Sequence, residues 1–282
     1  MQIMVTGGVG FVGTNLVKRL LREGHNVFSI DNYLTGKKEN KQEGCTYIDA
    51  DINNLGHISK LFSDIDVIFH MAALARIQPS LKNPQETIYT NVNGTLSILS
   101  LAKENNIPVI YAGSSSFHHG LYASAYAWSK HAGEQLCKLY SEIHGLSTSI
   151  CRFYNVYGPH QLEDGEYSTV LGIFEKQYRN NEPLTVTGNG EQRRDFTYID
   201  DIVDGLYRCM GKEFKAEIFE LGRGINYSIN EIVDMFGAER KYIPARNGEY
   251  DKTLCDYTNA AGLLGWEPKV DLQDYINRIK KI

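Results

Sequence analysis

Residues 4–16, MVTGGVGFVGTNL, decide the fold of this chain. They have the pattern of a buried strand, a glycine turn and the start of a helix. Glycine permits a tight turn and a close backbone approach, and the N-terminus of the helix then faces an anion such as a pyrophosphate. The spacing is Gly-x-x-Gly-x-x-Gly and differs from the Gly-x-Gly-x-x-Gly of ordinary dehydrogenases, but the physical requirements are the same. We therefore expect a dinucleotide-binding loop built from Gly7, Gly10, Phe11, Val12 and Gly13.

An acid follows this loop at the end of the next predicted strand. Asp31 ends the run HNVFSID, and Asn32 comes directly after it. A carboxylate at this place accepts hydrogen bonds from the adenosine ribose and repels a 2′-phosphate, so the cofactor NAD is expected rather than NADP. Lys37 and Lys38 lie close enough in the sequence to weaken that preference. The alternative is that Asp31 is an ordinary turn acid.

Short apolar runs alternate with longer helical stretches in the first half of the chain. The predicted strands are 2–6, 25–30, 66–70, 107–112 and 146–153, and the predicted helices are 11–24, 83–106 and 123–145. This alternation indicates an α/β fold with a doubly wound parallel (Rossmann) sheet, which binds ligands at the carboxyl ends of its strands. We expect this domain to occupy residues 1–157, with a return segment near 196–211. A smaller C-terminal substrate-binding region is expected over 158–282.

Composition narrows the function classes. Lys and Arg number 29 against 34 Asp and Glu, a net charge of −5 with no basic block, so nucleic acid is not an expected partner. No apolar run approaches the roughly 20 residues of a membrane span, and the first residues have the pattern of a strand, not of a signal peptide. The 5 cysteines are scattered without a Cys-x-x-Cys pair. We expect a reduced, cytoplasmic protein without a metal site.

A tyrosine and a lysine share one face of the predicted helix 123–145. Tyr126 and Lys130 are four residues apart, one helical turn. Free tyrosine, with a pKa of about 10, is a poor base at neutral pH, but a neighbouring ammonium stabilises its phenolate. Lys130 also suits a contact with a nicotinamide ribose. Tyr-x-x-x-Lys often occurs by chance, yet after a dinucleotide loop it predicts a catalytic base.

Further motifs follow in order along nearly the whole chain. They are TGGVGFVG, DNYLTG, HMAALA, NVNGT, GSSS, YAWSK, RFYNVYGP, GNGEQRRDFTYIDD, RNGE and LLGWEPK. With them the chain resembles the extended short-chain dehydrogenase/reductase family, specifically its NAD-dependent nucleotide-sugar epimerase/dehydratase branch and the UDP-hexose 4-epimerases in it. The resemblance implies a Rossmann domain that holds NAD and a C-terminal region that holds a nucleotide diphosphate.

The resemblance also implies roles for single residues. Near the cofactor, Asp51 and Ile52 flank the adenine, Ala72 and Ala73 line the cleft, and Asn91 lies in a core helix behind it.

For the substrate, the resemblance implies that Asn155 contacts the diphosphate and that Glu249 contacts the ribose. It assigns Arg194 and Arg246 to the phosphates, which suits permanently charged guanidinium forks. Thr253 is small at a place where enzymes that exclude N-acetyl sugars carry a bulky residue. The resemblance therefore implies that a UDP-N-acetylhexosamine is accepted.

The serine-rich stretch SSSFHHG (114–120) departs from the family pattern. The family's hydroxyl catalyst lies five residues before the glycine, which is Ser115 here, with Ser116 as a second candidate and Ser114 as a weaker one. This hydroxyl would share the proton of the sugar hydroxyl with Tyr126. His118 and His119 replace the usual Val-Tyr, and the segment from Ser115 to Tyr126 is shorter than in the family. Both departures leave the local substrate contacts open.

The resemblance implies a nucleotide-sugar 4-epimerase that oxidises C4 transiently with NAD. A serine hydrolase is disfavoured because no Gly-x-Ser-x-Gly elbow is present. A dehydratase is disfavoured because Ser116 and Phe117 stand where those enzymes carry Asp-Glu. A nucleotide-sugar decarboxylase, a keto-sugar reductase and a non-catalytic NAD-binding regulatory module remain open. UDP is the commonest nucleotide in the family, and dTDP, GDP and CDP remain alternatives. The resemblance also implies a homodimer, paired through the two long helices around Asn91 and Tyr126.

Overall fold

A parallel sheet at the centre of the molecule carries the candidate site. The computed structural model of the chain describes residues 1–246, 248 and 250–281. Within this part, a 7-stranded sheet has the order β11-β6-β5-β4-β1-β2-β3, and all its neighbouring strands are parallel. Its strands are β1 (Gln2–Thr6), β2 (Asn26–Asp31), β3 (Cys45–Asp49), β4 (Val67–His70), β5 (Val109–Ser114), β6 (Thr148–Phe153) and β11 (Lys215–Leu221). From β1 the chain adds β2 and β3 on one side, and it then crosses over to add β4 and the later strands on the other side. This switch between β1 and β4 creates a crevice at their carboxyl ends. The predicted doubly wound sheet is confirmed.

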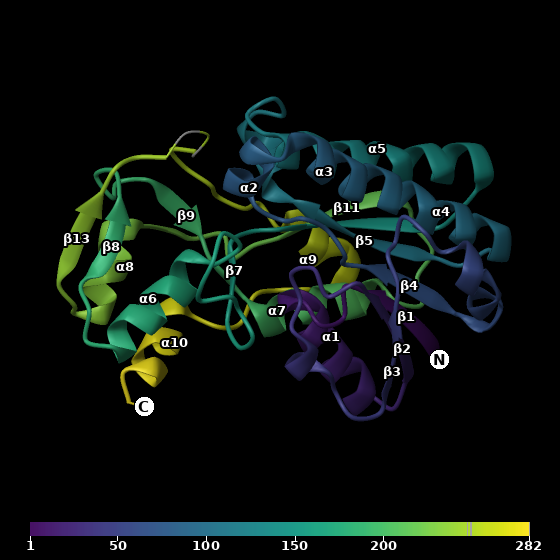
Figure 1. Cartoon of the computed structure of the whole chain (residues 1–282), viewed down its shortest axis with the longest axis horizontal. Coiled ribbons are helices and arrows are strands. Elements are labelled where there is room, and N and C mark those ends of the chain that lie inside the picture. Colours follow the sequence, from purple (N-terminus) through teal and green to yellow (C-terminus); the bar gives the residue numbers. More distant parts are fainter. Residues whose placement is uncertain (247, 249, 282) are drawn as a thin grey trace.

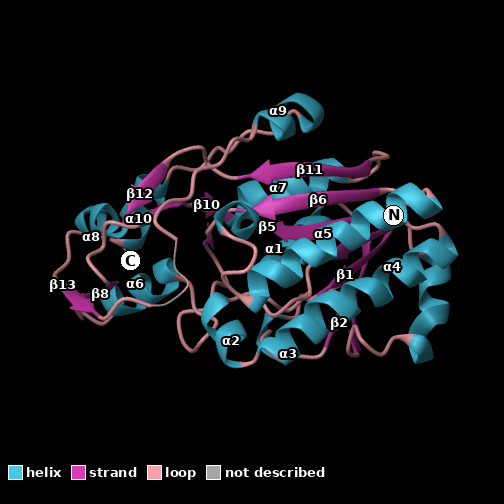
Figure 2. Cartoon of the chain, turned by 90° about the horizontal axis from the view of Figure 1, so that it is seen from above, coloured by secondary structure: helices cyan, strands magenta, loops and turns pink. Residues whose placement is uncertain are grey.

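Helices cover both faces of this sheet (Figure 1). On one face lie α3 (Pro84–Ile88), α4 (Gly94–Asn105) and α5 (Ala125–His144), and on the other lie α1 (Phe11–Arg22) and α7 (Ile199–Cys209). Viewed from above, α4 and α5 run side by side (Figure 2). The helix predicted over 83–106 is interrupted, because the π-helical turn η3 (Tyr89–Asn93) joins α3 to α4. The sheet and its helices form three layers.

A smaller set of elements lies beyond the carboxyl ends of the strands, at the opposite end of the molecule from β3 (Figure 1). The strand pairs there are β7 (Val156–Tyr157) with β10 (Thr197–Tyr198), β8 (Leu184–Thr187) with β13 (Arg240–Ile243), and β9 (Arg193–Asp195) with β12 (Asn226–Ser228). The helices there are α6 (Val170–Arg179), α8 (Ile229–Phe236) and α10 (Leu272–Ile279). The chain returns to the sheet with α7, β11 and α9 (Thr258–Leu264), which lies against β11. Short helical segments complete the fold: η1 (Lys38–Asn40), η2 (Gly56–Asp64), α2 (Ile77–Lys82) and η4 (Ser115–His119).

Local signals at both ends determine the position of α5. The Ser124 hydroxyl accepts a hydrogen bond from the Ala127 N–H at 3.1 Å and so caps the first turn. At the other end Gly145 adopts a left-handed conformation with φ 68°, which ends the helix. Tyr126 therefore lies in the first turn of α5 and Lys130 in the next, directly after the strand end that carries the serines.

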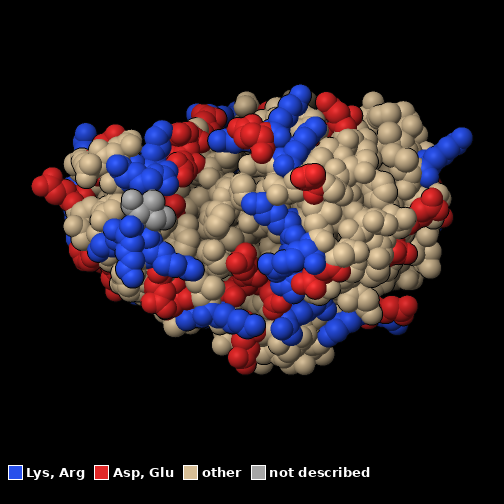
Figure 3. All heavy atoms as spheres, turned by 90° about the horizontal axis from the view of Figure 1, so that it is seen from below, with Lys and Arg blue, Asp and Glu red and all other residues tan. Residues whose placement is uncertain are grey.

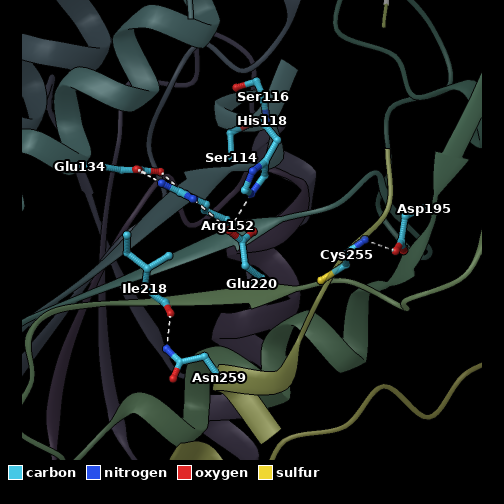
Figure 4. Close-up of polar contacts among 10 residues, drawn as sticks. All are labelled: Ser114, Ser116, His118, Glu134, Arg152, Asp195, Ile218, Glu220, Cys255 and Asn259. Atoms are coloured by element: carbon cyan, nitrogen blue, oxygen red, sulfur yellow. Dashed lines mark hydrogen bonds and ion pairs between the residues drawn. The ribbon is translucent and has the colours of Figure 1, made fainter. Parts of the chain in front are cut away.

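A buried charge network attaches α5 to the sheet (Figure 4). Arg152 on β6 donates to both carboxylate oxygens of Glu134 on α5, at 2.9 and 2.6 Å, and its third nitrogen donates to Glu220 on β11 at 2.9 Å. The side chains of Arg152 and Glu134 are 4% and 1% exposed. Such a bidentate pair fixes orientation, because each guanidinium N–H has one carboxylate oxygen to meet. The pair therefore determines where α5 lies on the sheet.

We predict that Arg152→Met lowers the free energy of unfolding by about 3–5 kcal/mol, because it leaves the Glu134 carboxylate buried without a partner. Urea denaturation followed by circular dichroism measures this loss. Lys176→Met is the matched control: Lys176 pairs with Asp164 at the surface, with side chains 42% and 71% exposed, and an exposed pair contributes about 1 kcal/mol or less. Equal small losses in both variants would contradict a structural role for the buried pair.

Candidate functional site

One cavity of about 780 Å³ runs between the sheet and the smaller set of elements. It is lined by the glycine loop, by the ends of β2 and β4, by the serine turn, by Tyr126 and by residues of the segments 153–157 and 162–174. Arg194 and Arg246 line it from the C-terminal half of the chain. Concave sites of this size at the switch point of a parallel sheet bind cofactors and substrates.

The glycine loop has the geometry of a phosphate site. Gly7 has φ 73° and donates its N–H to Ile30 at 2.8 Å, and Gly10 donates to the Gly7 carbonyl at 3.1 Å. A Cβ at Gly13 would lie 2.0 Å from that same carbonyl oxygen, so only glycine fits there. No described side chain caps the N-terminus of α1, which begins directly after Gly10. Its N–H groups are thus open to an anion in the cavity, beside Phe11 and Val12.

Asp31 ends β2 at the adjoining part of the cavity and is 8% exposed. Its carboxylate accepts the N–H of Tyr33 at 2.8 Å and the N–H of Val9 at 3.1 Å. Burial raises the pKa of Asp31, and these two backbone hydrogen bonds oppose the rise. Asn32 lines the same cavity and donates to Asp51 at 3.0 Å. The bonds hold the Asp31 carboxylate at the end of its strand, with further lone pairs available to a ribose.

Of the other residues predicted for the cofactor, some line the cavity and one supports its wall from behind. Ile52, Ala72 and Ala73 line the cavity. Asn91 is 2% exposed and bonds both the N–H and the carbonyl of Leu74, at 2.8 and 3.1 Å, so it braces the segment after β4. Its amide also donates to Ser129 on α5 at 2.9 Å. Asn91 therefore acts on the cleft from behind.

His70 is buried at the end of β4. Its ring nitrogens lie 2.8 Å from the Thr6 hydroxyl and 3.0 Å from the Thr95 hydroxyl. Burial, assisted by the charge of Lys130, lowers the pKa of His70 to about 3. A neutral ring bonded on both sides has no free nitrogen for chemistry.

The hydroxyl bonded to Tyr126 belongs to Ser114. Tyr126 donates to Ser114 Oγ at 3.2 Å. Ser115 and Ser116 line the same cavity, and Ser116 Oγ has no partner among the described residues. Ser114 is the last residue of β5, whereas Ser115 is the first residue of η4. Counting along the motif favours Ser115, while the direction in which the strand ends brings Ser114 to the phenol.

Lys130 lies one turn after Tyr126 on α5, and the charge of Arg76 acts on the Tyr126 phenol. The two cations act differently. Lys130 donates to the Ala112 carbonyl at 2.8 Å, and burial lowers its pKa to about 8 against the opposing charge of Glu134. Burial also raises the pKa of Tyr126, and the Ser114 hydrogen bond and the charge of Arg76 oppose that rise. Arg76 lines the cavity in the segment after β4. Sequence reasoning missed it, although an arginine inside the apolar run HMAALARI was a visible signal.

The two histidines attach the short serine turn to its surroundings. His118 Nε2 lies 2.8 Å from Glu220, the carboxylate that also receives Arg152 (Figure 4). The ring centroid of Phe117, the residue before His118, lies 3.6 Å from the Arg152 guanidinium carbon. His119 packs on Tyr250 with ring centroids 4.6 Å apart, and burial lowers its pKa. The turn is thus tied to β11 on one side and to the cavity wall on the other.

The residues predicted for the substrate diphosphate converge from three segments. Asn155 donates to the Asp195 carbonyl at 2.8 Å and to the Thr253 hydroxyl at 3.3 Å, and both Asn155 and Thr253 line the cavity. Thr253 is 2% exposed, and its hydroxyl also accepts the Asp195 N–H at 2.9 Å. Arg194 and Arg246 line the cavity as well. Glu249 lies outside the described residues.

The described part of the chain has few other features that suggest a ligand. No helix in it is long and apolar enough to cross a membrane. Nor do its His, Cys, Asp and Glu residues form a group of three or more able to hold a metal ion. On the face drawn in Figure 3, basic and acidic side chains lie beside one another in groups, separated by uncharged surface. Where opposite charges lie beside one another, their fields largely cancel within a Debye length in salt.

Comparison with known proteins identifies the group to which these features belong. The model of the NAD dependent epimerase/dehydratase family matches residues 3–222. A putative UDP-glucose 4-epimerase of Methanocaldococcus jannaschii is 32% identical over 99% of this chain and 97% of its own length. UDP-glucuronic acid decarboxylase 4 of Arabidopsis thaliana is 32% identical over 97% of this chain and 66% of its own. The structure of UDP-glucuronic acid 4-epimerase from Bacillus cereus superposes with a TM-score of 0.90 at 30% identity, covering 100% of this chain and 98% of that one.

We predict that Asp31→Asn weakens NAD binding about tenfold or more and narrows the preference over NADP. A charged acceptor of ribose hydrogen bonds contributes about 1.5–3 kcal/mol, and its charge repels a 2′-phosphate. Calorimetric titration of the cofactor-free protein with each dinucleotide measures both effects. Asp49→Asn is the control, because Asp49 lies opposite Asp31 on β3 but does not line the cavity. Similar changes in the two variants would argue against a ribose contact at Asp31.

Proposed function

The chain belongs to the NAD-dependent epimerase/dehydratase family, and we propose that within it the chain is a nucleotide-sugar 4-epimerase. One observation carries this proposal. A tyrosine hydroxyl bonded to a serine hydroxyl lines the same cavity as a phosphate-binding glycine loop and two arginines from the C-terminal half. Such a cavity suits a dinucleotide at one end and a nucleotide diphosphate at the other, with the sugar between them at Tyr126.

In the proposed mechanism Tyr126 takes the proton from the sugar O4. A serine hydroxyl of the turn, Ser114 or Ser115, bridges the phenol and the sugar and carries the proton between them. Bound NAD supplies the acceptor, and later the donor, of the C4 hydride. Arg194 and Arg246 hold the diphosphate, so that the sugar can turn over about a fixed anchor and present its other face. Asn155 holds the strand end beside the arginines. Lys130 is assigned to the nicotinamide ribose and to the phenolate.

Two related activities share the first step. A decarboxylase also oxidises C4 but then loses the sugar carboxylate as CO₂, and a keto-sugar reductase consumes reduced cofactor stoichiometrically. A non-catalytic NAD-binding module would keep the glycine loop without needing Tyr126. The bonded Tyr126 and Ser114 side chains favour a catalyst. Enzymes of this family differ in the sugar and in the nucleotide that carries it. For the nucleotide we propose UDP.

We also propose a homodimer in the cytoplasm. Large apolar side chains are exposed on the helical face formed by α3, η3, α4 and α5, namely Ile88, Tyr89, Leu96, Trp128, Leu139 and Ile143. A helical face of this kind suits a self-complementary interface around a twofold axis. All 5 cysteines have free thiols, which fits a reducing compartment.

Epimerisation in heavy water tests the proposed reaction. If the hydride moves from C4 to NAD and back inside the cavity, the product has unchanged mass, inverted C4 and no deuterium on carbon. Tyr126→Phe should retain NAD but lose about 10² to 10⁴ in turnover, the usual contribution of a positioned general base. Tyr140→Phe is the control on the same helix, since the Tyr140 hydroxyl bonds Ser100 and the residue does not line the cavity. Deuterium at C3 or C5 would indicate enolisation instead, and full turnover in Tyr126→Phe would exclude the assigned base.

Paired alanine substitutions separate the two candidate serines. Because Ser114 accepts the Tyr126 hydrogen bond, we predict that Ser114→Ala lowers kcat at least tenfold and shifts the pH profile upward, since that bond opposes the rise in the phenol pKa. Ser115→Ala should lower kcat without the shift if Ser115 contacts only the sugar. Steady-state rates between pH 6 and 10, a range of about two units either side of a neutral-to-basic group, provide the measurement. If only Ser115→Ala shifted the pH profile, the serine that acts on Tyr126 would be Ser115, as the motif predicts.

A further inference from the structure

Arg76 brings a positive charge into the cavity that no described carboxylate neutralises. Its Nε donates to the Tyr167 carbonyl and one terminal nitrogen donates to the Ala75 carbonyl, both at 2.9 Å. Among the described residues it forms no ion pair. Burial lowers the pKa of Arg76, but a guanidinium stays protonated in proteins. The charge is therefore permanent, and the second terminal nitrogen has N–H donors to spare.

The described acids of the cavity wall are engaged elsewhere. They are Asp31 and Glu166. Asp31 receives backbone N–H groups at the end of β2, and Glu166 pairs with Lys82 at the end of α2. A partly buried cation without a counter-charge is costly to a protein. Arg76 is thus best explained by an anion that enters the cavity with a ligand.

The position of Arg76 identifies the part of the ligand. Arg194 and Arg246 are assigned to the diphosphate, and the N-terminus of α1 to the cofactor pyrophosphate. Arg76 instead lines the cavity together with Tyr126, the residue assigned to the sugar O4, and the Tyr167 carbonyl holds its Nε at 2.9 Å. Its charge lowers the pKa of Tyr126 against the raising effect of burial. In a hexose, the substituent next to C4 that can carry a charge is C6, attached to C5. Because C5 adjoins C4 in the ring, a carboxylate at C6 lies at the same edge of the sugar as O4 in both C4 epimers, within reach of a cation near the phenol.

We propose that Arg76 binds the C6 carboxylate of the sugar, and that the substrate is therefore a nucleotide-linked hexuronic acid. This rests on the proposed function and specifies its substrate class. The guanidinium fork matches a carboxylate with parallel hydrogen bonds. Polar groups with no described partner, Ser116 Oγ and Tyr250 Oη, also lie on cavity-lining residues and are available to the sugar hydroxyls.

Arg76 can be tested by comparing two substrates on the NAD-bound enzyme. UDP-glucuronate and UDP-glucose differ only at C6, so the ratio of their kcat/KM values isolates the carboxylate contact. The wild type should prefer the uronate at least tenfold. Arg76→Met should lower kcat/KM for UDP-glucuronate about 100-fold, the usual effect of truncating one partner of a shielded charge pair, mainly through KM. The rate on UDP-glucose should change less than about threefold. Arg76→Lys keeps the charge without the guanidinium fork, so its kcat/KM for UDP-glucuronate should lie between those of the wild type and Arg76→Met.

Lys82→Met is the matched control, since Lys82 is a second cation of the cavity wall but is paired with Glu166. Its substrate ratio should equal that of the wild type. The wild-type preference can be measured without any variant, so poor folding of Arg76→Met does not remove the test.

Four outcomes would overturn the assignment of Arg76. The first is a wild type that prefers UDP-glucose or UDP-N-acetylglucosamine. The second and third are equal losses of kcat/KM on both substrates in Arg76→Met, accompanied either by weaker binding of UDP alone or by a displaced pH profile of kcat. The fourth is a substrate ratio that Arg76→Met leaves unchanged. The second would place Arg76 at the diphosphate, and the third would make it a tuner of Tyr126.

Failure of the proposed function has a different signature. If the chain is not an epimerase of this kind, the enzyme would epimerise no sugar nucleotide, and no sugar nucleotide would reduce the bound NAD. A uronate that is consumed with loss of CO₂ and with dependence on Arg76 would support the carboxylate contact while replacing the epimerase by a decarboxylase.

Discussion

The bidentate pair between Arg152 and Glu134 is the interaction on which the site depends. It joins the centre of α5 to β6, and α5 is the helix that carries Tyr126 and Lys130. The same guanidinium reaches Glu220 on the edge strand β11, and through it the serine turn. A buried ion pair contributes little net stability, but it is intolerant of displacement. Its effect is to fix the phenol relative to the strand ends where both ligands are expected to meet.

The electrostatics of the cavity follow from its expected occupants. Anions require donors and positive charge, and the cavity supplies the open N-terminus of α1 and three arginines, Arg76, Arg194 and Arg246. The acid at its expected cofactor end is Asp31, whose carboxylate is expected to accept ribose hydroxyls and to repel an additional phosphate. Burial raises the pKa of Tyr126, so positive charge beside the phenol is needed to favour its ionised form. The positive charge of Arg76, and of oxidised cofactor when bound, acts in that direction.

The short serine turn, whose sequence departs from the pattern of the family, is held by its two histidines. His118 bonds Glu220, and His119 packs on Tyr250. Gly248 lies against α2 and against the segment before Tyr126: a Cβ there would be 3.3 Å from Ile77 and 3.6 Å from the Ala123 carbonyl oxygen. One wall of the cavity is thus formed by a C-terminal segment that also carries Arg246. In the proposed function, sugar selectivity depends on this wall and on Arg76 together.

The sequence alone determined the features that arise from local backbone constraints. The alternation of strands and helices predicted the doubly wound sheet, the positive φ of Gly7 and the crowding at Gly13 explain the glycine loop, and helical spacing placed Tyr126 and Lys130 on one face. Tertiary structure decided what depends on distant partners. The strands β3 and β11 were missed because edge strands carry polar residues and lack a continuous apolar run. Ser114 reaches Tyr126 because of where β5 ends, a difference of one residue that motif counting does not resolve. The importance of Arg76 follows only from the walls that shield it, because a charge acquires its energy from its surroundings and not from its neighbours in the chain.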